Sequence, residues 1–190
     1  MMSDDRPRGD AALRPRLARP GDPPDPATET LRAVLAARAP GLAWQITPLP
    51  FVVDRWAFFE ATLLEGSEVP TERYVVDVTR GVVPPGEARV LGEIFGTLDV
   101  LGAGRTSATT LARLASCLAG SPGQVLDEAA LPFPGAPPGL HPPRWERHAA
   151  GGRLAYCELA GARHPRFTRW ELELAADYGV AWRQTPLGPS

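Results

Sequence analysis

The strictest two-residue hydrophobic period in the chain lies between Arg169 and Leu174. There the sequence RWELEL alternates charged and apolar residues at every position. A strand with this period buries one face and exposes the other, as in an antiparallel sheet that packs on a single apolar layer. The turn-like AADYG leads into VAWRQT, and RLAYCEL precedes the strand. We therefore expect a three-stranded antiparallel meander over about residues 153–184, with helices covering its apolar face.

A second group of strands is expected over about residues 42–79. The segments LAWQITPLPFVVDRWAFFEATLLEG and ERYVVDVTRG are rich in aromatic and β-branched residues, and SEVPT separates them. This pattern favours a strand followed by a long hairpin. The apolar residues Val52, Trp56, Phe59 and Leu63 also fit a helical spacing, so a helix at Trp56–Leu64 remains an alternative. Whether the two strand groups form one sheet is left open.

Helices are expected between the two strand groups, over about residues 86–131. After a proline pair, apolar residues recur at three- and four-residue spacing, which predicts a helix that ends near Gly102. These residues are Leu91, Ile94, Phe95, Leu98 and Leu101. Gly92 and Gly96 lie on one face of this helix, and each should cost about 1 kcal/mol relative to alanine. Close packing of another backbone there, from this chain or from a second copy, would explain both glycines.

Two more helices are predicted to complete this layer. Ser107 or Thr106 caps a helix that runs through Leu111, Leu114 and Leu118. In GSPGQVLDEAAL, Ser121 is the expected N-cap of a third helix, with Pro122 at its first position. A hairpin around Gly151 and Gly152 in RWERHAAGGRLAYCEL should follow, after the proline-rich linker LPFPGAPPGLHPP. The predicted class is α+β.

The first 27 residues differ in composition from the rest. They are rich in proline and charge and poor in large apolar side chains, so we expect residues 1–27 to be a disordered tail rather than a signal peptide. Residues 28–190 then form a single α+β domain. It begins with a helix that Thr28 caps and that Pro40 and Gly41 end. With 44% hydrophobic residues, the chain has enough apolar material for one core.

Composition excludes several function classes. Every basic residue is arginine, and asparagine is absent as well, which is typical of a GC-rich, bacterial-like coding bias. Without lysine there is no P-loop lysine, no kinase lysine and no Schiff base. A net charge of -2 creates no long-range field that would gather nucleic acid or anionic lipid. Two cysteines and no apolar run of membrane-spanning length predict a soluble, cytoplasmic protein.

The glycine-rich stretch DVLGAGRTS superficially resembles a dinucleotide-binding turn. Gly102 and Gly104 supply two glycines, Ser107 stands in place of the third, and Asp127 follows about twenty residues later. The element before the glycines has a helical period, however, whereas the fingerprint requires a strand. We therefore interpret these glycines as a helix C-cap followed by a connector, and expect no cofactor.

Other candidate catalytic and metal-binding residues are scattered. His141, His148 and His164, with Cys157, include zinc-ligand types but match no zinc template, so we predict no metal site. Cys117 lies in a leucine-bearing segment and is interpreted as a small core residue rather than a nucleophile. Three carboxylates of the first strand group are interpreted as strand-face charges, although they could converge in a cleft. They are Asp54, Glu60 and Asp77.

The predicted order of three helices and a hairpin resembles a winged helix-turn-helix, which makes nucleic-acid binding the runner-up function. Arginines that could contact phosphates are Arg105, Arg113, Arg144, Arg147 and Arg153. The supposed recognition helix, however, carries Asp127 and Glu128, which would repel phosphates.

No coherent catalytic set is present, and five tryptophans could offer aromatic surface to a partner. We therefore expect a non-catalytic interaction or adaptor domain with a protein partner, and a homo-oligomer is left open. A small hydrolase or metal enzyme with a noncontiguous site is the third hypothesis.

Overall fold

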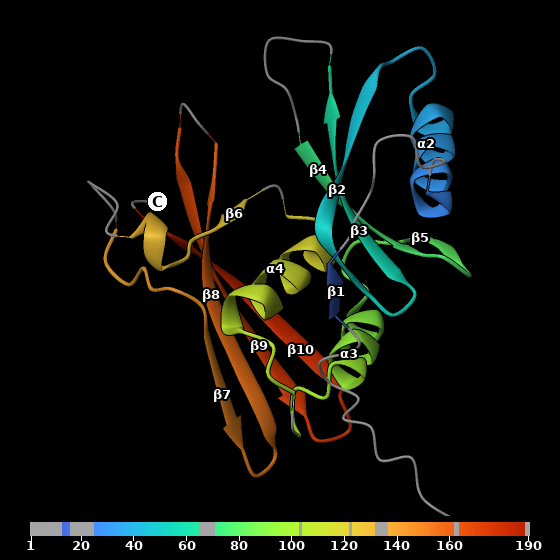
Figure 1. Ribbon diagram of the computed structural model, residues 1–190. Coiled ribbons are helices and arrows are strands. Elements are labelled where there is room, and N and C mark those ends of the chain that lie inside the picture. Colours follow the sequence, from blue (N-terminus) through green and yellow to red (C-terminus); the bar gives the residue numbers. More distant parts are fainter. Residues whose placement is uncertain are drawn as a thin grey trace, which may run out of the picture.

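The computed structural model describes residues 13–15, 25–64, 71–102, 104–121, 123–131, 137–161 and 164–188. They form two antiparallel sheets and three α-helices, which confirms the α+β class (Figure 1). Sheet A has the strand order β1-β2-β3-β4-β5, and sheet B has the order β10-β9-β8-β6, with β7 also paired to β8. The elements of sheet A and its helix are β1 (Leu13–Pro15), α2 (Pro26–Arg38), β2 (Trp44–Val53), β3 (Trp56–Leu63), β4 (Thr71–Asp77) and β5 (Gly81–Val83). The remaining elements are α3 (Ala88–Thr97), α4 (Ala108–Ala119), β6 (Gln124–Val125), the 3-10 helix η1 (Glu128–Ala130), β7 (Arg144–His148), β8 (Gly151–Ala160), β9 (Arg166–Ala175) and β10 (Val180–Leu187).

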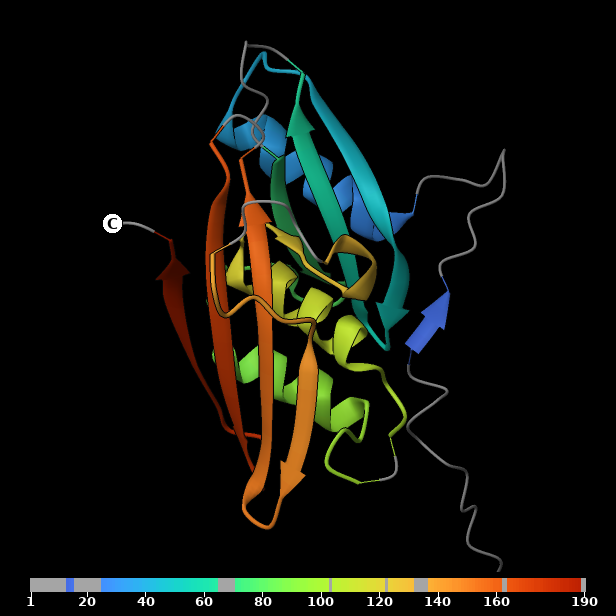
Figure 2. The ribbon, with the colours of Figure 1, turned by 90° about the vertical axis from the view of Figure 1, so that its left-hand side faces the viewer.

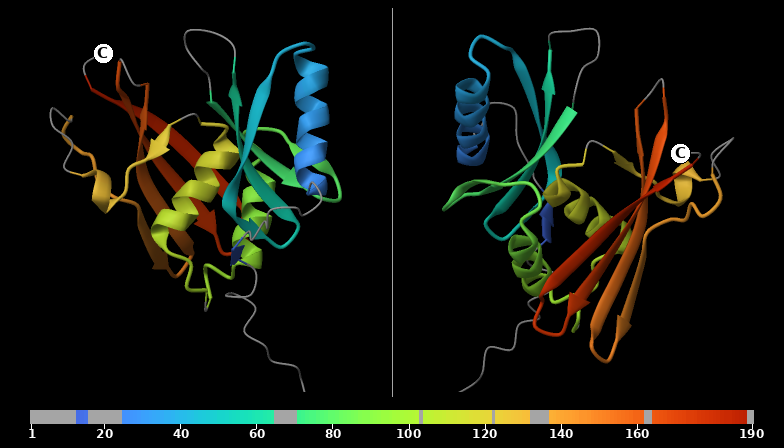
Figure 3. Two further views of the ribbon diagram at one scale, coloured as in Figure 1. Left: turned by 45° about the horizontal axis from the view of Figure 1, so that its top comes forward. Right: turned by 180° about the vertical axis from the view of Figure 1, so that it is seen from behind.

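The elements stack in four layers. Helix α2 covers the outer face of sheet A, while α3 and α4 lie between sheet A and the inner face of sheet B (Figures 1 and 3). Leu31 and Leu35 of α2 pack with Phe59 and Val76 of sheet A in a small core. The strand groups thus form two separate sheets, with the predicted helical layer between them.

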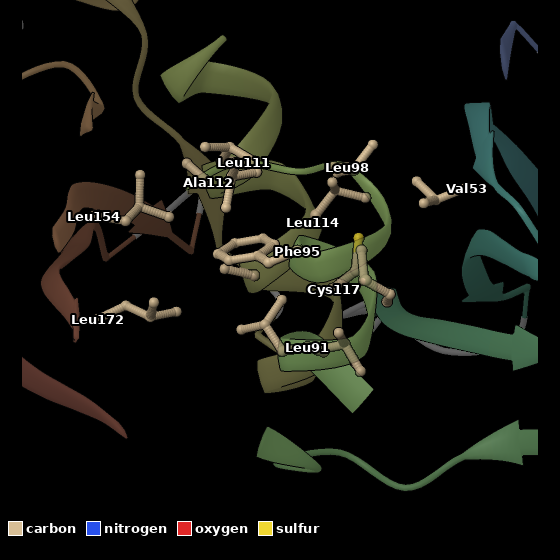
Figure 4. Close-up of a cluster of buried hydrophobic side chains, with 14 of the residues drawn as sticks. Val53, Leu91, Phe95, Leu98, Leu111, Ala112, Leu114, Cys117, Leu154 and Leu172 are labelled. Carbon is tan, nitrogen blue, oxygen red and sulfur yellow. The ribbon is translucent and has the colours of Figure 1, made fainter. Parts of the chain in front are cut away.

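The main core is centred on α3 and α4. The buried ring of Phe95 lies between these helices and sheet B, where Leu154 and Leu172 face it, and Val53 of sheet A closes the opposite side (Figure 4). Burying one large apolar side chain contributes about 1.5–3 kcal/mol, so this shared core is what holds the two sheets together.

The strand patterns of the sequence correspond to real strands. The alternation at Arg169–Leu174 lies in β9, with Leu172 and Leu174 both 1% exposed, and β8, β9 and β10 form the predicted meander. The hairpin β7–β8 is also present. Trp56–Leu63 is the strand β3, because its pairing with β2 and β4 on both sides outweighs the helical spacing.

The first helix begins earlier than predicted. Asp25 caps α2 and accepts a hydrogen bond from the Ala27 amide at 3.3 Å, whereas Thr28 lies inside the helix. An Asp-Pro pair supplies both a cap and a proline at the first helical position, and it outweighs the threonine signal. Within the predicted tail, Leu13–Pro15 pairs with β2 as β1. Residues 1–12 and 16–24 lie outside the described residues.

The predicted third helix is wrong. In place of a helix capped by Ser121, the chain forms the short strand β6, and then η1 with Asp127 as its cap. Gln124 and Val125 pair with β8, and the Leu126 amide donates to the Cys157 carbonyl at 2.9 Å. Burial of Val125 and Leu126 against sheet B outweighs the local cap signal. Among the described residues, the predicted order of three α-helices and a hairpin is therefore not formed, and Pro122 lies outside these residues.

Helix α3 and its glycines follow the prediction in part. Helix α3 ends at Thr97 with Leu98 as its C-cap, so Gly102 and Gly104 lie in the connector and do not cap the helix. Ser107 caps the next helix, α4, as predicted. The glycine face of α3 packs inside the chain. A Cβ on Gly92 would lie 2.2 Å from the carbonyl oxygen of Tyr178, in the β9–β10 turn.

Candidate binding cleft between the sheets

A cleft opens between sheet A and sheet B beside α4, with a volume of about 380 Å³. We call it the inter-sheet cleft. Figure 3 shows α4 lying between the two sheets at this place, with β6 of sheet B beside it. The cleft is lined by Leu49, Pro50, Phe51, Glu60, Arg73, Arg113, Cys117, Gln124 and Val125. Its volume lies in the lower part of the range of about 300–1,000 Å³ that is typical of ligand pockets.

An irregularity in β2 forms the apolar wall of this cleft. Pro48 pairs with Phe59 and Val52 pairs with Ala57, so the β2 segment between them holds extra residues relative to β3. This β-bulge consists of residues 49–51, all of which line the cleft. The Phe51 ring lies 5.3 Å from the ring of Phe58. Bulges recur where a strand turns side chains toward a functional site.

Arg73 is the best-anchored charged side chain of the cleft. Its side chain is only 13% exposed, and its Nε donates to Glu60 Oε1 at 3.2 Å. Its Nη1 donates to Ser116 Oγ and to the Gly123 carbonyl, both at 2.5 Å. Within the described residues, no group accepts a hydrogen bond from Nη2. The guanidinium is thus fixed in position and keeps one donor group for a ligand.

A chain of hydrogen bonds extends from Arg73 to sheet B. The Gly123 amide donates to Ser121 Oγ at 3.2 Å, and the Ser121 hydroxyl donates to Glu158 Oε2. The indole N–H of Trp170 donates to the same oxygen at 2.9 Å. Glu158 is 2% exposed, and its Oε1 has no hydrogen-bond partner among the described residues. These contacts tie the α4–β6 connection to both sheets and so rigidify the floor of the cleft.

The second guanidinium of the cleft is more exposed. Arg113, one turn before Cys117 on α4, has a side chain that is 51% exposed, and its Nη2 lies 3.4 Å from Asp127 Oδ2. Cys117 itself is 3% exposed, and burial raises the pKa of its thiol to about 12. A thiol with this pKa stays protonated at neutral pH, so Cys117 is a core residue, as predicted, and a poor nucleophile.

Of the five arginines proposed for nucleic acid, only Arg113 lines the cleft. Arg105 and Arg144 are exposed elsewhere. Arg147 donates to the carbonyl groups of Gly102 and Gly104, and Arg153 forms ion pairs with Glu171 and Glu173. The last two arginines therefore have structural partners within the chain.

Within the described part of the chain, the candidate metal ligands do not gather into one group, although the His141 backbone contacts the Cys157 thiol. His141 Nδ1 lies 2.9 Å from the carbonyl oxygen of Pro142, and His148 lies 3.9 Å from Glu173 at the far end of sheet B. Cys157 is buried, while His164 is exposed in the β8–β9 connection. Among the described residues, no three His, Cys, Asp or Glu side chains are grouped as metal ligands.

The three carboxylates of the first strand group do not share the cleft. Asp54 is exposed in the β2–β3 turn, and only Glu60 lines the cleft. Asp77 is 3% exposed. Its burial raises the pKa, but hydrogen bonds from Thr79 and from Arg55 outweigh burial and lower the pKa below 3.8. These contacts make Asp77 a structural anchor of the β4–β5 turn.

The tryptophans do not form an exposed aromatic surface. Trp56 is buried, and the other four are half-buried. On the inner face of sheet B, Trp170 stacks at 6.2 Å on Tyr156 and meets Trp182 edge to face at 6.5 Å. Trp44 packs on the core under α2 and the other four on the core between the sheets, so the candidate site is the cleft and not a tryptophan patch.

Comparison with known proteins adds no relative: no family model, no curated protein and no solved structure matches this chain. Within the described ranges, every helix is too short or too polar to cross a bilayer.

Proposed function

We propose that this protein is a non-catalytic interaction domain that binds a segment of a partner protein in the inter-sheet cleft. The observation that carries the proposal is the anchored Arg73, which lines the cleft together with the apolar bulge of residues 49–51 and whose Nη2 donates to no group among the described residues. A carboxylate on the partner would bind this donor, and a neighbouring apolar side chain would pack on Leu49 and Phe51.

The chemistry of the cleft favours binding over catalysis. Its thiol is protonated, Glu60 is paired with Arg73, and Arg113 is paired with Asp127. General acid–base or nucleophilic catalysis needs a group that is free to exchange a proton or to attack. Two unpaired cysteines also fit a reducing, intracellular compartment, which we include in the proposal.

The test is affinity capture of the full chain from lysate of its source organism, with and without nuclease, in three forms. The wild type is compared with Arg113→Glu in the cleft and with Arg80→Glu, an exposed control outside it. Both variants change the net charge by the same amount. We expect one stoichiometric protein partner whose recovery resists nuclease, falls at least about tenfold for Arg113→Glu and stays unchanged for Arg80→Glu.

Three results would overturn the proposal. They are capture of no stoichiometric protein, equal loss in both variants, and recovery that depends on nucleic acid. The last result would favour the nucleic-acid alternative.

A further inference from the structure

Strand β10 is a free sheet edge. It ends the strand order of sheet B, and no described strand pairs with its outer side (Figure 2, dark red). From Val180 to Thr185 the edge runs for six residues without a proline, and Arg183 is its one charged residue. An edge of this kind presents unpaired N–H and C=O groups that another strand can complete.

The other edges of the two sheets are blunted. Strand β2 carries Pro48 and Pro50 and is partly covered by β1, β5 has three residues, and β6 has two. Strand β7 is exposed, but three of its five residues are arginine or glutamate. Proline, short length and charge are the usual protections against edge-to-edge pairing. Among the described strands, β10 has the longest edge without such protection.

We propose that β10 pairs antiparallel with β10 of a second copy of this chain, with Trp182 on the two-fold axis. In an antiparallel ladder, two directly opposed residues lie on the same face of the sheet. When two identical strands pair symmetrically, the two-fold axis must therefore pass between one residue and its own copy, and this residue is the centre of the pairing. Centring on Trp182 opposes two indole rings on the inner face and places Ala181 opposite the partner's Arg183. Centring on Arg183 would oppose two guanidinium groups, and centring on Gln184 would bring Pro186 into the ladder.

The outer face is charge-complementary in this register. Ala181 pairs with Glu173 of β9, and Arg183 pairs with Glu171. Four residues therefore lie side by side across the dimer on this face: Glu173, Ala181, the partner's Arg183 and the partner's Glu171. The two-fold axis generates a second, identical set of four. With strands about 4.8 Å apart, Arg183 reaches over the small Ala181 toward Glu173 of the other copy. Arg183 and Glu173 have side chains that are 75% and 58% exposed, so both can be reached from a second copy, although Arg183 is paired with Glu171 and Glu173 with Arg153 within the chain. This match favours a second copy over an unrelated strand.

The first test measures disulfide trapping in the full chain. Across the axis, Trp182→Cys would place two Cα atoms about 4.5–5.5 Å apart, within disulfide reach. The matched control Gln184→Cys would face the partner's Val180 and would not link. Native Cys117 and Cys157 are buried and do not interfere. We expect mild oxidation to link Trp182→Cys into dimers and to leave Gln184→Cys monomeric on denaturing gels.

The second test does not depend on correct folding of the Trp182→Cys variant, because it leaves Trp182 unchanged. By sedimentation equilibrium, we expect the wild type to be a dimer and Arg183→Glu to weaken the dimer about tenfold through repulsion by Glu173. Adding Glu173→Arg restores the opposite charges across the axis, so the double variant should regain affinity. Both variants lose the Arg183–Glu171 ion pair within the chain, and the double variant also loses the Glu173–Arg153 pair, so the readout is the dimer dissociation constant and not the stability of the monomer.

The proposal is overturned by a monomeric wild type at about 100 μM, by linking of Gln184→Cys as efficient as that of Trp182→Cys, or by no rescue in the double variant. It is independent of the cleft, since none of the tested residues lines it.

Discussion

The two glycines of α3 should respond in opposite directions to the same substitution. Gly92→Ala places a Cβ 2.2 Å from the carbonyl oxygen of Tyr178, a backbone atom in the β9–β10 turn. Tyr178 has a φ of 64°, so this turn has little freedom to retreat. Overpacking of this kind costs about 1–3 kcal/mol or more, which exceeds the gain of up to about 1 kcal/mol in helix propensity. We expect Gly92→Ala to destabilise the fold by about 1–2 kcal/mol.

Gly96→Ala is the matched control on the same helix. Its Cβ would lie 3.6 Å from the Tyr178 ring, an ordinary van der Waals contact. The gain in helix propensity should therefore dominate, although it is smaller here because Gly96 lies next to the helix end. We expect Gly96→Ala to be about 0.5–1 kcal/mol more stable than the wild type. Urea unfolding of the three proteins measures both effects as free energies of unfolding. Equal destabilisation by the two substitutions, or a stabilising Gly92→Ala, would refute the close backbone approach.

Three further predictions concern Asp77, the cysteines and Ser107. Because the pKa of Asp77 lies below its ordinary value of 3.8, its contribution to stability is complete above that pH and is lost as the pH falls through the lower folded value. Asp77→Asn should therefore flatten the fall in unfolding free energy below about pH 4 in urea titrations, and an unchanged slope would contradict this reasoning. Cys117 and Cys157 are buried with raised pKa values, so iodoacetamide at pH 8 should label neither in the native protein and both in urea, as read by intact mass. Stoichiometric native labelling would show that the thiols are accessible. Ser107→Ala removes the N-cap of α4 and should lower the free energy of unfolding by about 1 kcal/mol in the same assay. An unchanged free energy of unfolding would show that this cap does not stabilise the helix.

The regular elements could be predicted because their signals repeat along the chain. The alternation in β9 and the three- and four-residue spacing in α3 each involve several positions that agree, so local propensity and burial point to one answer. The segment at Gln124–Val125 lacks such repetition. A serine and a proline indicate a helix start, but pairing with a strand more than thirty residues away decides the structure.

The cleft itself was not predicted, although three of its residues were considered for other roles. The sequence indicates a strand-face charge for Glu60, a phosphate contact for Arg113 and a core position for Cys117. Arg73 was missed entirely, because an arginine at the start of an apolar strand normally faces solvent. Its partners Ser116 and Gly123 lie 43 and 50 positions away, so no local pattern connects them. The one local signal was the pair of prolines in β2, which indicates an interrupted strand and hence the bulge.

The central claim is that a partner protein binds in the inter-sheet cleft, and amide hydrogen exchange with and without the captured partner tests it most directly. We predict that binding slows exchange in peptides that cover the bulge at residues 49–51 and the segment at residues 123–126. Exchange on the outer face of α2 should stay unchanged. Protection confined to α2 or to other surfaces, with the bulge and β6 unaffected, would contradict the claim.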